Sequence, residues 1–368
     1  MSKKLYSLLA LLMVASLVLA ACGSPAAEEP AAEEPAAEEP AAEEPAAEEP
    51  AAEEPMEEMA TLICQVTDVG GIDDKSFNAT AWKGIEDSVA DFGVEGQYLE
   101  SQEQSDYETN INAFIEQGCA VIITVGFLLG DATAAAAEAN PDQEFGIIDF
   151  AYDPAIDNVT GHVFATDQAA FLAGYVAAAT TETGVVGTFG GIPIPPVTVF
   201  MDGFWYGVQY YNAQKGTDVQ VLGWDPAAPD QGLFTGNFES LDDGRALGVS
   251  LMDEGADVIM PVAGPVGLGT AAAVQERGNA WIVGVDNDWS QTASDYADVI
   301  LTSVLKNMDS TVYTQVENYL NGVDSGALIV GTLESGGVGI AGSFDAELQA
   351  ELDAAAAGVI AGEIQTAP

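Results

Sequence analysis

Beyond residue 60 the chain alternates between short apolar runs and longer stretches in which apolar residues recur at helical spacing. Trp82, Ile85, Val89 and Phe92 recur every three or four residues, which is typical of an amphipathic helix. Such an alternation of strands and helices predicts parallel sheets with helices on both faces. The expected strands span residues 62–67, 97–100, 121–125, 145–148, 159–164, 185–189, 219–222, 258–262, 281–285, 299–304 and 327–333.

These strands are more than one sheet comfortably holds, so we predict two doubly wound α/β domains. In domains of this kind, ligands bind beyond the C-terminal ends of the parallel strands. The side chains that directly follow each strand are therefore the first candidates for a binding site.

The first 21 residues have the pattern of an export signal. Lys3 and Lys4 form a basic start, and a mostly apolar stretch then leads to the sequence LAAC, which ends at Cys22. Small residues followed directly by a cysteine are typical of a bacterial lipobox, in which the cysteine becomes the lipidated first residue. The alternative is an ordinary secretory signal with a coincidental cysteine. We expect a lipid anchor at Cys22 and a location on the extracytoplasmic face of the cell membrane.

Residues 22–60 are expected to form a disordered linker. Residues 26–55 are six copies of AAEEP, in which regular prolines interrupt any long helix and glutamate repulsion extends the chain. At ~3 Å per residue, the segment from Cys22 to Met59 spans roughly 100 Å at most. A solubilising tail is the alternative, but a spacer between a lipid anchor and a working domain explains more. No later stretch offers a long uncharged apolar run that would form a membrane-spanning helix.

The chain is strongly acidic, with a formal net charge of −51. Of its 59 acidic residues, 14 precede Met59, which leaves 45 acidic residues in the body against six basic ones. Such a surface favours solubility and repels nucleic acids and anionic lipid headgroups. We therefore expect no nucleic-acid partner.

The cysteines beyond the lipobox, Cys64 and Cys119, both have apolar neighbours. We expect two buried thiols, and a disulfide is the alternative that export would permit. No Cys/His metal spacing exists, and His162 is the only histidine of the chain. The sequence therefore predicts neither a metal site nor a cofactor.

The segment VTDVGGIDDKSFNATAWKG, residues 66–84, follows the first expected strand. Asp68 lies at the strand tip, the two glycines after it permit a tight loop, and Asp74 or the nearby serine can cap a helix. Phe77 and Asn78 are then held at the start of that helix, where they face the crevice expected beyond the C-terminal ends of the strands. A plain capped loop explains the glycines and the serine, but not the aromatic, amide and carboxylate side chains together.

Other candidate residues follow other expected strands. They are Phe127 and Asp131 after residues 121–125, Phe200 and Phe204 beyond 185–189, Gly264 after 258–262, Asp286 after 281–285 and Lys306 after 299–304. Each alone has a simpler explanation, because a strand-end aspartate often caps a helix and Phe204 is expected in the core. Since five strand ends converge on one crevice, we interpret them together as a binding site.

The motifs DVGGIDDKSFN, VGF…D, GGIPIPPVTVFMDGF, GADVIMPVAG, GVDND and SVLKN occur in this order. In this order they resemble the basic membrane lipoprotein (BMP) family of bacterial ABC-transporter solute-binding proteins, which includes purine nucleoside receptors. The resemblance covers residues 62–345. It implies a type I periplasmic-binding-protein-like fold, two α/β domains joined by three crossovers, expected near Ala165, Trp289 and Ser325.

The crossovers divide the body into an N-terminal lobe of residues 61–165 plus 290–325 and a C-terminal lobe of residues 166–289 plus 326–368. The resemblance also implies that the protein binds a nucleoside, with a purine expected, and delivers it to an ABC permease. It implies no enzymatic activity. We expect the protein to be a monomer.

Residue by residue, the resemblance assigns roles to eight positions. It implies that Phe77 and Phe200 sandwich the base, that Asn78 and Asp131 hydrogen-bond its edge, that Asp68, Asp286 and Lys306 bind the ribose hydroxyls, and that Gly264 offers its backbone. One departure from the family is the turn GPVG, residues 264–267, because its proline has no backbone N–H to donate.

Other functions have weaker support in the sequence. A dinucleotide-dependent enzyme would need G-x-G-x-x-G after a strand, and GPVGLG has the wrong spacing. With His162 as the only histidine, no Ser-His-Asp or Cys-His set is expected. The alternatives left open are a binding protein for a sugar or other small molecule, a secreted nucleoside hydrolase with an aspartate cluster and calcium, and a passive surface or sensory protein.

Overall fold

The computed structural model describes residues 60–323 and 325–368. The expected signal peptide, the lipidated Cys22 and the linker up to residue 59 lie outside the described residues. Among the helices of the described part, none has the length and apolar character needed to cross a membrane.

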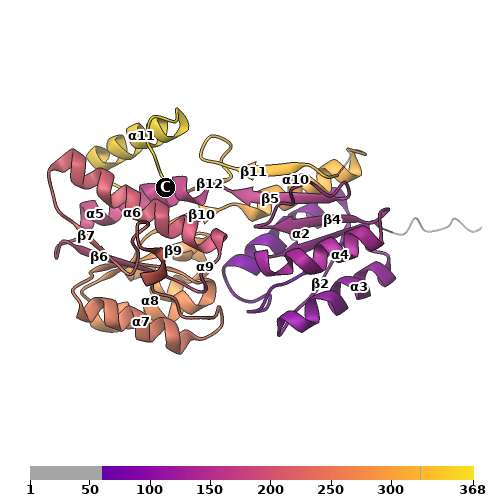
Figure 1. The fold of residues 1–368 in the computed structure, drawn as a ribbon, viewed down its shortest axis with the longest axis horizontal. Coiled ribbons are helices and arrows are strands. Elements are labelled where there is room, and N and C mark those ends of the chain that lie inside the picture. The colour runs from indigo at the N-terminus through magenta and orange to yellow at the C-terminus, as the bar shows by residue number, and fades with distance from the viewer. Residues whose placement is uncertain (1–59, 324) are drawn as a thin grey trace, which may run out of the picture. The chain divides into compact units, whose positions relative to one another are not determined.

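Within the described part of the chain, two six-stranded sheets form two lobes (Figure 1). The first sheet is entirely parallel, and its strands in spatial order are β11 (Leu328–Gly331), β5 (Val159–Phe164), β4 (Glu144–Ile148), β3 (Val121–Val125), β1 (Leu62–Val66) and β2 (Glu95–Leu99). The second sheet is parallel except for its first strand, and its order is β12 (Val338–Ala341), β10 (Ile300–Lys306), β9 (Trp281–Asp286), β8 (Val258–Val262), β6 (Val185–Gly190) and β7 (Gln220–Leu222). The predicted fold class is confirmed.

Helices cover both faces of the first sheet. One face packs against α2 (Phe77–Phe92) and α10 (Met308–Leu320), and the other against α3 (Tyr107–Gln117) and α4 (Gly130–Ala139). The alternation of strand side chains explains this: Ile63 of β1 joins the core under α2, and the next residue, Cys64, joins the core under α3. The second lobe contains α5 (Thr166–Thr180), α6 (Pro195–Lys215), α7 (Leu241–Asp253), α8 (Gly267–Arg277), α9 (Trp289–Thr292) and α11 (Ala346–Ile360).

In the described residues, five short 3₁₀ helices interrupt the connections. They are η1 (Gln104–Asp106), η2 (Phe127–Leu129), η3 (Pro229–Gln231), η4 (Gly264–Val266) and η5 (Ser294–Val299). Two of them occupy equivalent places, because η2 lies between β3 and α4 and η4 lies between β8 and α8. At the C-terminal ends of β3 and β8, the chain therefore makes a tight turn before the next helix begins.

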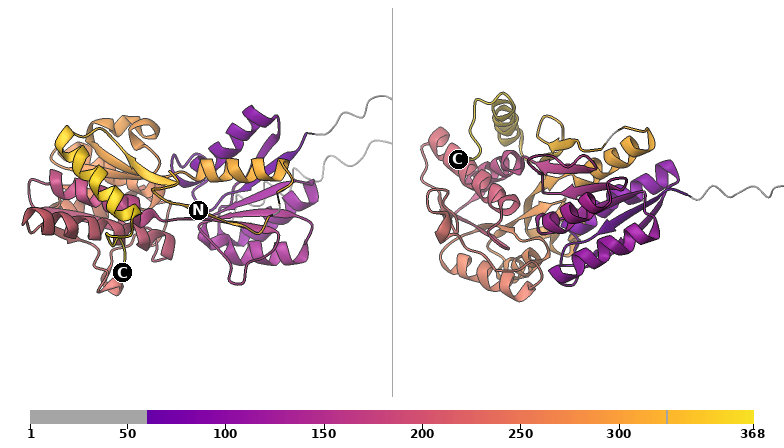
Figure 2. Two further views of the ribbon diagram at one scale, coloured as in Figure 1. Left: turned by 90° about the horizontal axis from the view of Figure 1, so that it is seen from above. Right: turned by 45° about the vertical axis from the view of Figure 1, so that its right-hand side comes forward.

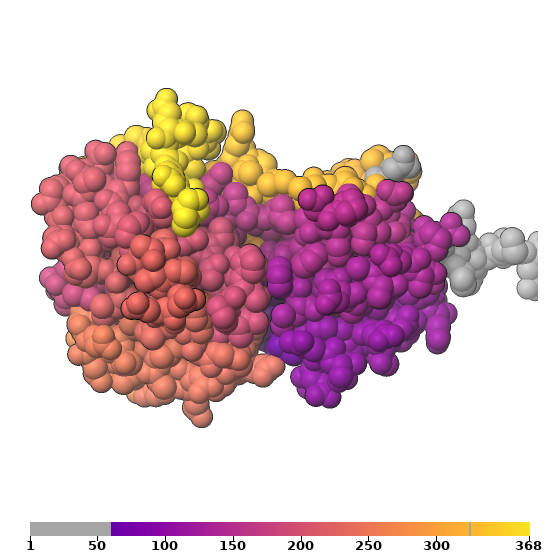
Figure 3. All heavy atoms as spheres, viewed as in Figure 1, coloured from indigo at the N-terminus to yellow at the C-terminus, as the bar shows by residue number. Residues whose placement is uncertain are grey.

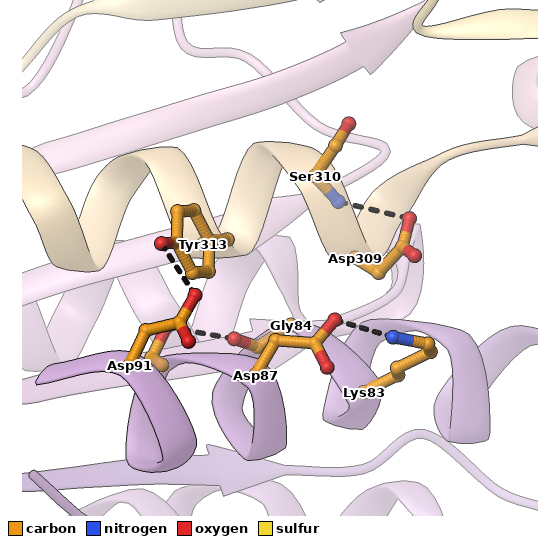
Figure 4. A network of polar contacts seen from close by, with 8 residues as sticks. Lys83, Gly84, Asp87, Asp91, Asp309, Ser310 and Tyr313 are labelled. Atoms are coloured by element: carbon orange, nitrogen blue, oxygen red, sulfur yellow. Dashed lines mark hydrogen bonds and ion pairs between the residues drawn. The ribbon is translucent and has the colours of Figure 1, made fainter. Parts of the chain in front are cut away.

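Helix α10 belongs to the first lobe although it follows the last parallel strand of the second sheet (Figure 2). It packs along α2, where a Cβ at Gly84 would lie 2.4 Å from the carbonyl oxygen of Asp309, so only glycine permits this approach. Beside this contact, the Tyr313 hydroxyl donates to Asp91 Oδ2 at 3.0 Å (Figure 4). Helix α10 is therefore held against α2, the first helix after the linker.

The crossovers between the lobes correct the expected boundaries at residues 290 and 325. The chain passes to the second lobe between β5 and α5, where Ala165 lies. It returns after Lys306, because β10 hydrogen-bonds to β9 and β12 rather than to the first sheet. It crosses the third time between β11 and β12, beyond residue 331. The apolar pattern shows that residues 299–304 form a strand, but not which sheet the strand joins.

The two body cysteines form a disulfide, so the expectation of two free buried thiols is wrong. Cys64 lies in β1, and Cys119 comes two residues before β3, the parallel neighbour of β1. Their Cα atoms are 6.0 Å apart, which is within the range of a disulfide. The pairing of these strands is not visible in the sequence, and it is what brings the two sulfur atoms together.

Candidate functional site

A cavity of about 620 Å³, its opening to solvent included, lies between the two lobes, and Figure 3 shows the groove along which the lobes meet. Its lining comes from the C-terminal ends of strands in both sheets. Seven of the eight residues singled out from the sequence line it, namely Asp68, Phe77, Asn78, Phe200, Gly264, Asp286 and Lys306.

Asp131 is the predicted residue that the structure does not bring to the cavity. It lies in the first turn of α4, and its side chain is exposed. The reason is the short helix η2, which separates the end of β3 from α4 and places Phe127 in the cavity wall instead. Phe204, expected in the core, is fully buried there.

The start of α2 is held by Asp74. Its carboxylate accepts hydrogen bonds from the backbone N–H groups of Ser76 at 2.9 Å, Asn78 at 2.8 Å and Ala79 at 3.0 Å. These are groups that a helix start leaves without partners, so the bonds fix the first turn and with it the Phe77 ring at the cavity. Burial raises the pKa of Asp74 to about 6, although these hydrogen bonds oppose the rise.

Asn78 points its amide toward the loop before it. Its Oδ1 accepts a hydrogen bond from the backbone N–H of Asp68 at 3.1 Å, and the side chain is 1% exposed. Asn78 therefore links the end of β1 to the start of α2 as well as lining the cavity.

Lys306 lies at the end of β10 and is almost fully buried. Its ammonium group pairs with Asp149 Oδ2, which belongs to the other lobe. The same Nζ lies 5.0 Å from the ring centroid of Phe77, 5.3 Å from that of Phe164 and 5.7 Å from that of Phe200. Lys306 therefore contacts aromatic faces contributed by both lobes.

Asp149 is a cavity residue that sequence reasoning missed. It directly follows β4, as Asp286 directly follows the final apolar residues of β9, and both have a positive φ, 67° and 71°. Burial raises the pKa of both carboxyl groups, while Lys306 opposes the rise. The signal was present, since IIDF ends a strand with an aspartate just as GVDND does.

Direct polar contacts join the two lobes. Ser76 Oγ donates to Asp286 Oδ2 at 2.7 Å, and Asn287 Nδ2 donates to the backbone oxygen of Lys75 and to Thr80 Oγ1, each at 3.0 Å. The start of α2 in the first lobe is thus held by two consecutive residues of the second lobe.

The remaining wall is largely apolar, with Ile194, Val197 and Phe238 supplied by the second lobe. Sequence reasoning did not select these residues, because apolar side chains in loops carry no signal that separates a cavity wall from a core. At the turn after β8, Gly264 has a φ of 54° and is followed by Pro265. In residues 60–323 and 325–368, no group of three or more His, Cys, Asp and Glu side chains is placed to hold a metal ion.

Residues 62–365 match the model of the Bmp family, described as ABC transporter substrate-binding protein PnrA-like. The chain belongs to this family. The resemblance that the sequence motifs carry is thereby confirmed, and the Bmp family consists of solute-binding proteins rather than enzymes.

Curated relatives of this Bmp-family protein cover most of the chain. The ABC transporter nucleoside-binding protein BmpA of Lactococcus lactis is 30% identical over 292 residues, 74% of this chain and 79% of the relative. Basic membrane protein A of Borreliella burgdorferi is 31% identical over 303 residues, 80% of this chain and 84% of the relative.

Solved structures agree with the fold. An ABC-transporter solute-binding protein of Aeropyrum pernix K1 superimposes with a TM-score of 0.69 at 30% identity, covering 82% of this chain and 81% of that one. A solute-binding protein of Conexibacter woesei matches with a TM-score of 0.64 at 22% identity, covering 83% and 98%, which supports the fold alone. The chain is therefore a solute-binding component of an ABC transport system, with a small-molecule ligand and a permease as its partners.

Proposed function

We propose that this Bmp-family protein binds a nucleoside, with a purine expected, between its two lobes and delivers it to an ABC permease. The observation that supports this best is that Phe77 and Phe200 line one cavity from different lobes. Flat heterocycles such as nucleobases stack on aromatic rings, and stacking tolerates any base because each has a π-face. The Lactococcus lactis relative, whose name specifies nucleoside binding, supports the same ligand class.

The buried carboxylates supply acceptors for the sugar. Asp68 and Asp286 line the cavity with side chains that are 8% and 7% exposed. Carboxylates accept hydrogen bonds from vicinal hydroxyls, and such bonds are stronger than neutral ones. Lys306 offsets part of the negative charge and donates to any acceptor that the ligand offers. In this proposal the aromatic side chains bind the base and the charged side chains bind the ribose.

We further propose that the protein is anchored by a lipid at Cys22 and works on the extracytoplasmic face of the membrane. The LAAC sequence supports the anchor, and the AAEEP repeats support a spacer that lets the binding lobes reach a permease.

Isothermal titration with a panel of nucleosides, free bases and pentoses tests the ligand class. The proposal predicts that nucleosides bind more tightly than their separate bases or sugars, because both halves of the cavity are then engaged. Tighter binding of a pentose would favour a sugar-binding protein instead. Release of hypoxanthine from inosine would identify a nucleoside hydrolase and overturn the proposal.

A further inference from the structure

Asp68 is held through only one of its two carboxylate oxygens. Its Oδ1 accepts a hydrogen bond from the backbone N–H of Val69 at 2.7 Å and a second one from the hydroxyl of Tyr107. Its Oδ2 accepts no hydrogen bond from any residue that the structure describes. Because Asp68 lines the cavity, the oxygen without a protein donor is the one left for a ligand.

Tyr107 lies at the start of α3 and is 3% exposed. It is not among the residues that line the cavity, but its hydroxyl donates to Oδ1 of Asp68, which does line it. The hydroxyl therefore contacts the carboxylate without being placed to contact a ligand.

Two further features restrict the carboxylate. The backbone N–H of Asp68 donates to Asn78 Oδ1 at 3.1 Å, which fixes the main chain at the end of β1. On the other side, a Cβ at Gly126 would lie 2.6 Å from Asp68 Oδ2, and Gly126 has a φ of 122°. A larger residue would displace the carboxylate, so Gly126 gives Asp68 Oδ2 the space it occupies.

We propose that Tyr107 is a positioning residue, which binds one oxygen of Asp68 and thereby orients the other toward the ligand. This inference rests on the proposed function, in which Asp68 accepts a hydrogen bond from a nucleoside hydroxyl. It predicts that Tyr107 affects ligand binding only through Asp68.

The hydrogen bond from Tyr107 helps to keep Asp68 ionised among the other acidic groups near it. Burial raises the pKa of Asp68, and the nearby carboxylates of Glu239 and Asp149 raise it further, while the hydrogen bonds from Tyr107 and the Val69 N–H oppose the rise. Among the described residues, the cavity lining also contains the charged side chains of Asp74, Asp286 and Lys306. Removing the Tyr107 hydroxyl therefore favours the protonated form of Asp68, which accepts less well.

The test replaces Tyr107→Phe and measures adenosine affinity between pH 5 and pH 8. We expect binding to weaken about tenfold at pH 7, because a hydrogen bond to a charged group is lost. The loss of affinity on acidification should also begin at a higher pH than in the parent protein, because the hydrogen bond from Tyr107 lowers the pKa of Asp68. A role in folding alone would not move the pH profile.

Tyr175→Phe is the matched control. Tyr175 is also 3% exposed, and its hydroxyl also donates to a carboxylate, Glu351 Oε2 at 2.8 Å, but this pair joins α5 to α11 outside the cavity. The control should leave both the affinity and its pH profile unchanged. Equal behaviour of Tyr107→Phe and Tyr175→Phe would overturn the inference.

A double-mutant cycle with Asp68→Ala separates positioning from other effects. If Tyr107 acts through Asp68, the Tyr107→Phe change has no further effect once Asp68 is gone, and additive losses would contradict the inference.

The titration of the Asp68 carboxyl carbon by NMR, without any ligand, provides an independent measurement. It should occur at higher pH in Tyr107→Phe, and an unchanged titration would refute the positioning role. A parent protein that binds no nucleoside would contradict the proposed function alone, and the ligand-free titration would then decide the role of Tyr107.

Discussion

Replacing Phe200→Leu tests the aromatic part of the site without removing the bulk of the side chain. Phe200 is 2% exposed and belongs both to the cavity wall and to the core of the second lobe. Truncation to alanine would therefore mix two effects, since a Phe→Ala change in a core costs about 3–5 kcal/mol of stability. Leucine keeps most of the volume and typically costs less than about 1.5 kcal/mol.

The expected loss of binding follows from stacking. Base–aromatic stacking contributes about 1–3 kcal/mol per base, and leucine retains part of the contact area. A loss of about 1–2 kcal/mol weakens nucleoside binding roughly 5-fold to 30-fold. Free ribose, which has no base, should lose no affinity.

Phe204→Leu is the control, because this side chain lies one helical turn further along α6, is fully buried and does not line the cavity. Titration calorimetry gives the dissociation constants, and urea unfolding gives the stability of each variant. Similar stability losses with a binding defect confined to Phe200→Leu would support the stacking role. An unchanged nucleoside affinity in Phe200→Leu would refute it.

Three further predictions concern the anchor, the ligand charge and the disulfide. Cys22→Ser should release the protein from the membrane fraction of expressing cells, and a variant that stays bound as tightly as the parent would contradict lipid anchoring. AMP should displace labelled adenosine far less well than adenosine does, because the lining formed by the described residues holds Asp68, Asp74, Asp149 and Asp286 against one cation, Lys306; equal competition would show that this interpretation of the charges is wrong. Replacing both Cys64 and Cys119 by serine should lower the free energy of unfolding by about 4 kcal/mol, because the bond closes a loop of 55 residues; unchanged urea unfolding would argue against that contribution.

Local patterns predicted the architecture well, because alternating strands and helices follow from apolar spacing along the chain. The same information does not reveal strand partners. Residues 299–304 were correctly expected to form a strand, but its place in the second sheet depends on hydrogen bonds to β9 and β12. The pairing of β1 with β3, which brings Cys64 beside Cys119, is a contact of the same kind.

In the candidate site too, the sequence indicated some residues and could not indicate others. Side chains that directly follow a strand, such as Asp68, Asp286 and Lys306, could be selected because the ends of parallel strands meet in one place. Asp131 was misplaced because a short 3₁₀ helix separates it from the strand end. Tyr107 could not be found, since it acts on Asp68 from 39 residues away and begins a helix whose sequence shows nothing unusual.

A crystal structure of the protein grown with a purine nucleoside tests the central claim most directly. The account predicts that the base lies between the rings of Phe77 and Phe200, and that the ribose hydroxyls lie within hydrogen-bonding distance of Asp68 Oδ2, Asp286 or Lys306. A nucleoside bound elsewhere, or bound in this cavity with its base against the carboxylates and its ribose against the two phenylalanines, would contradict it.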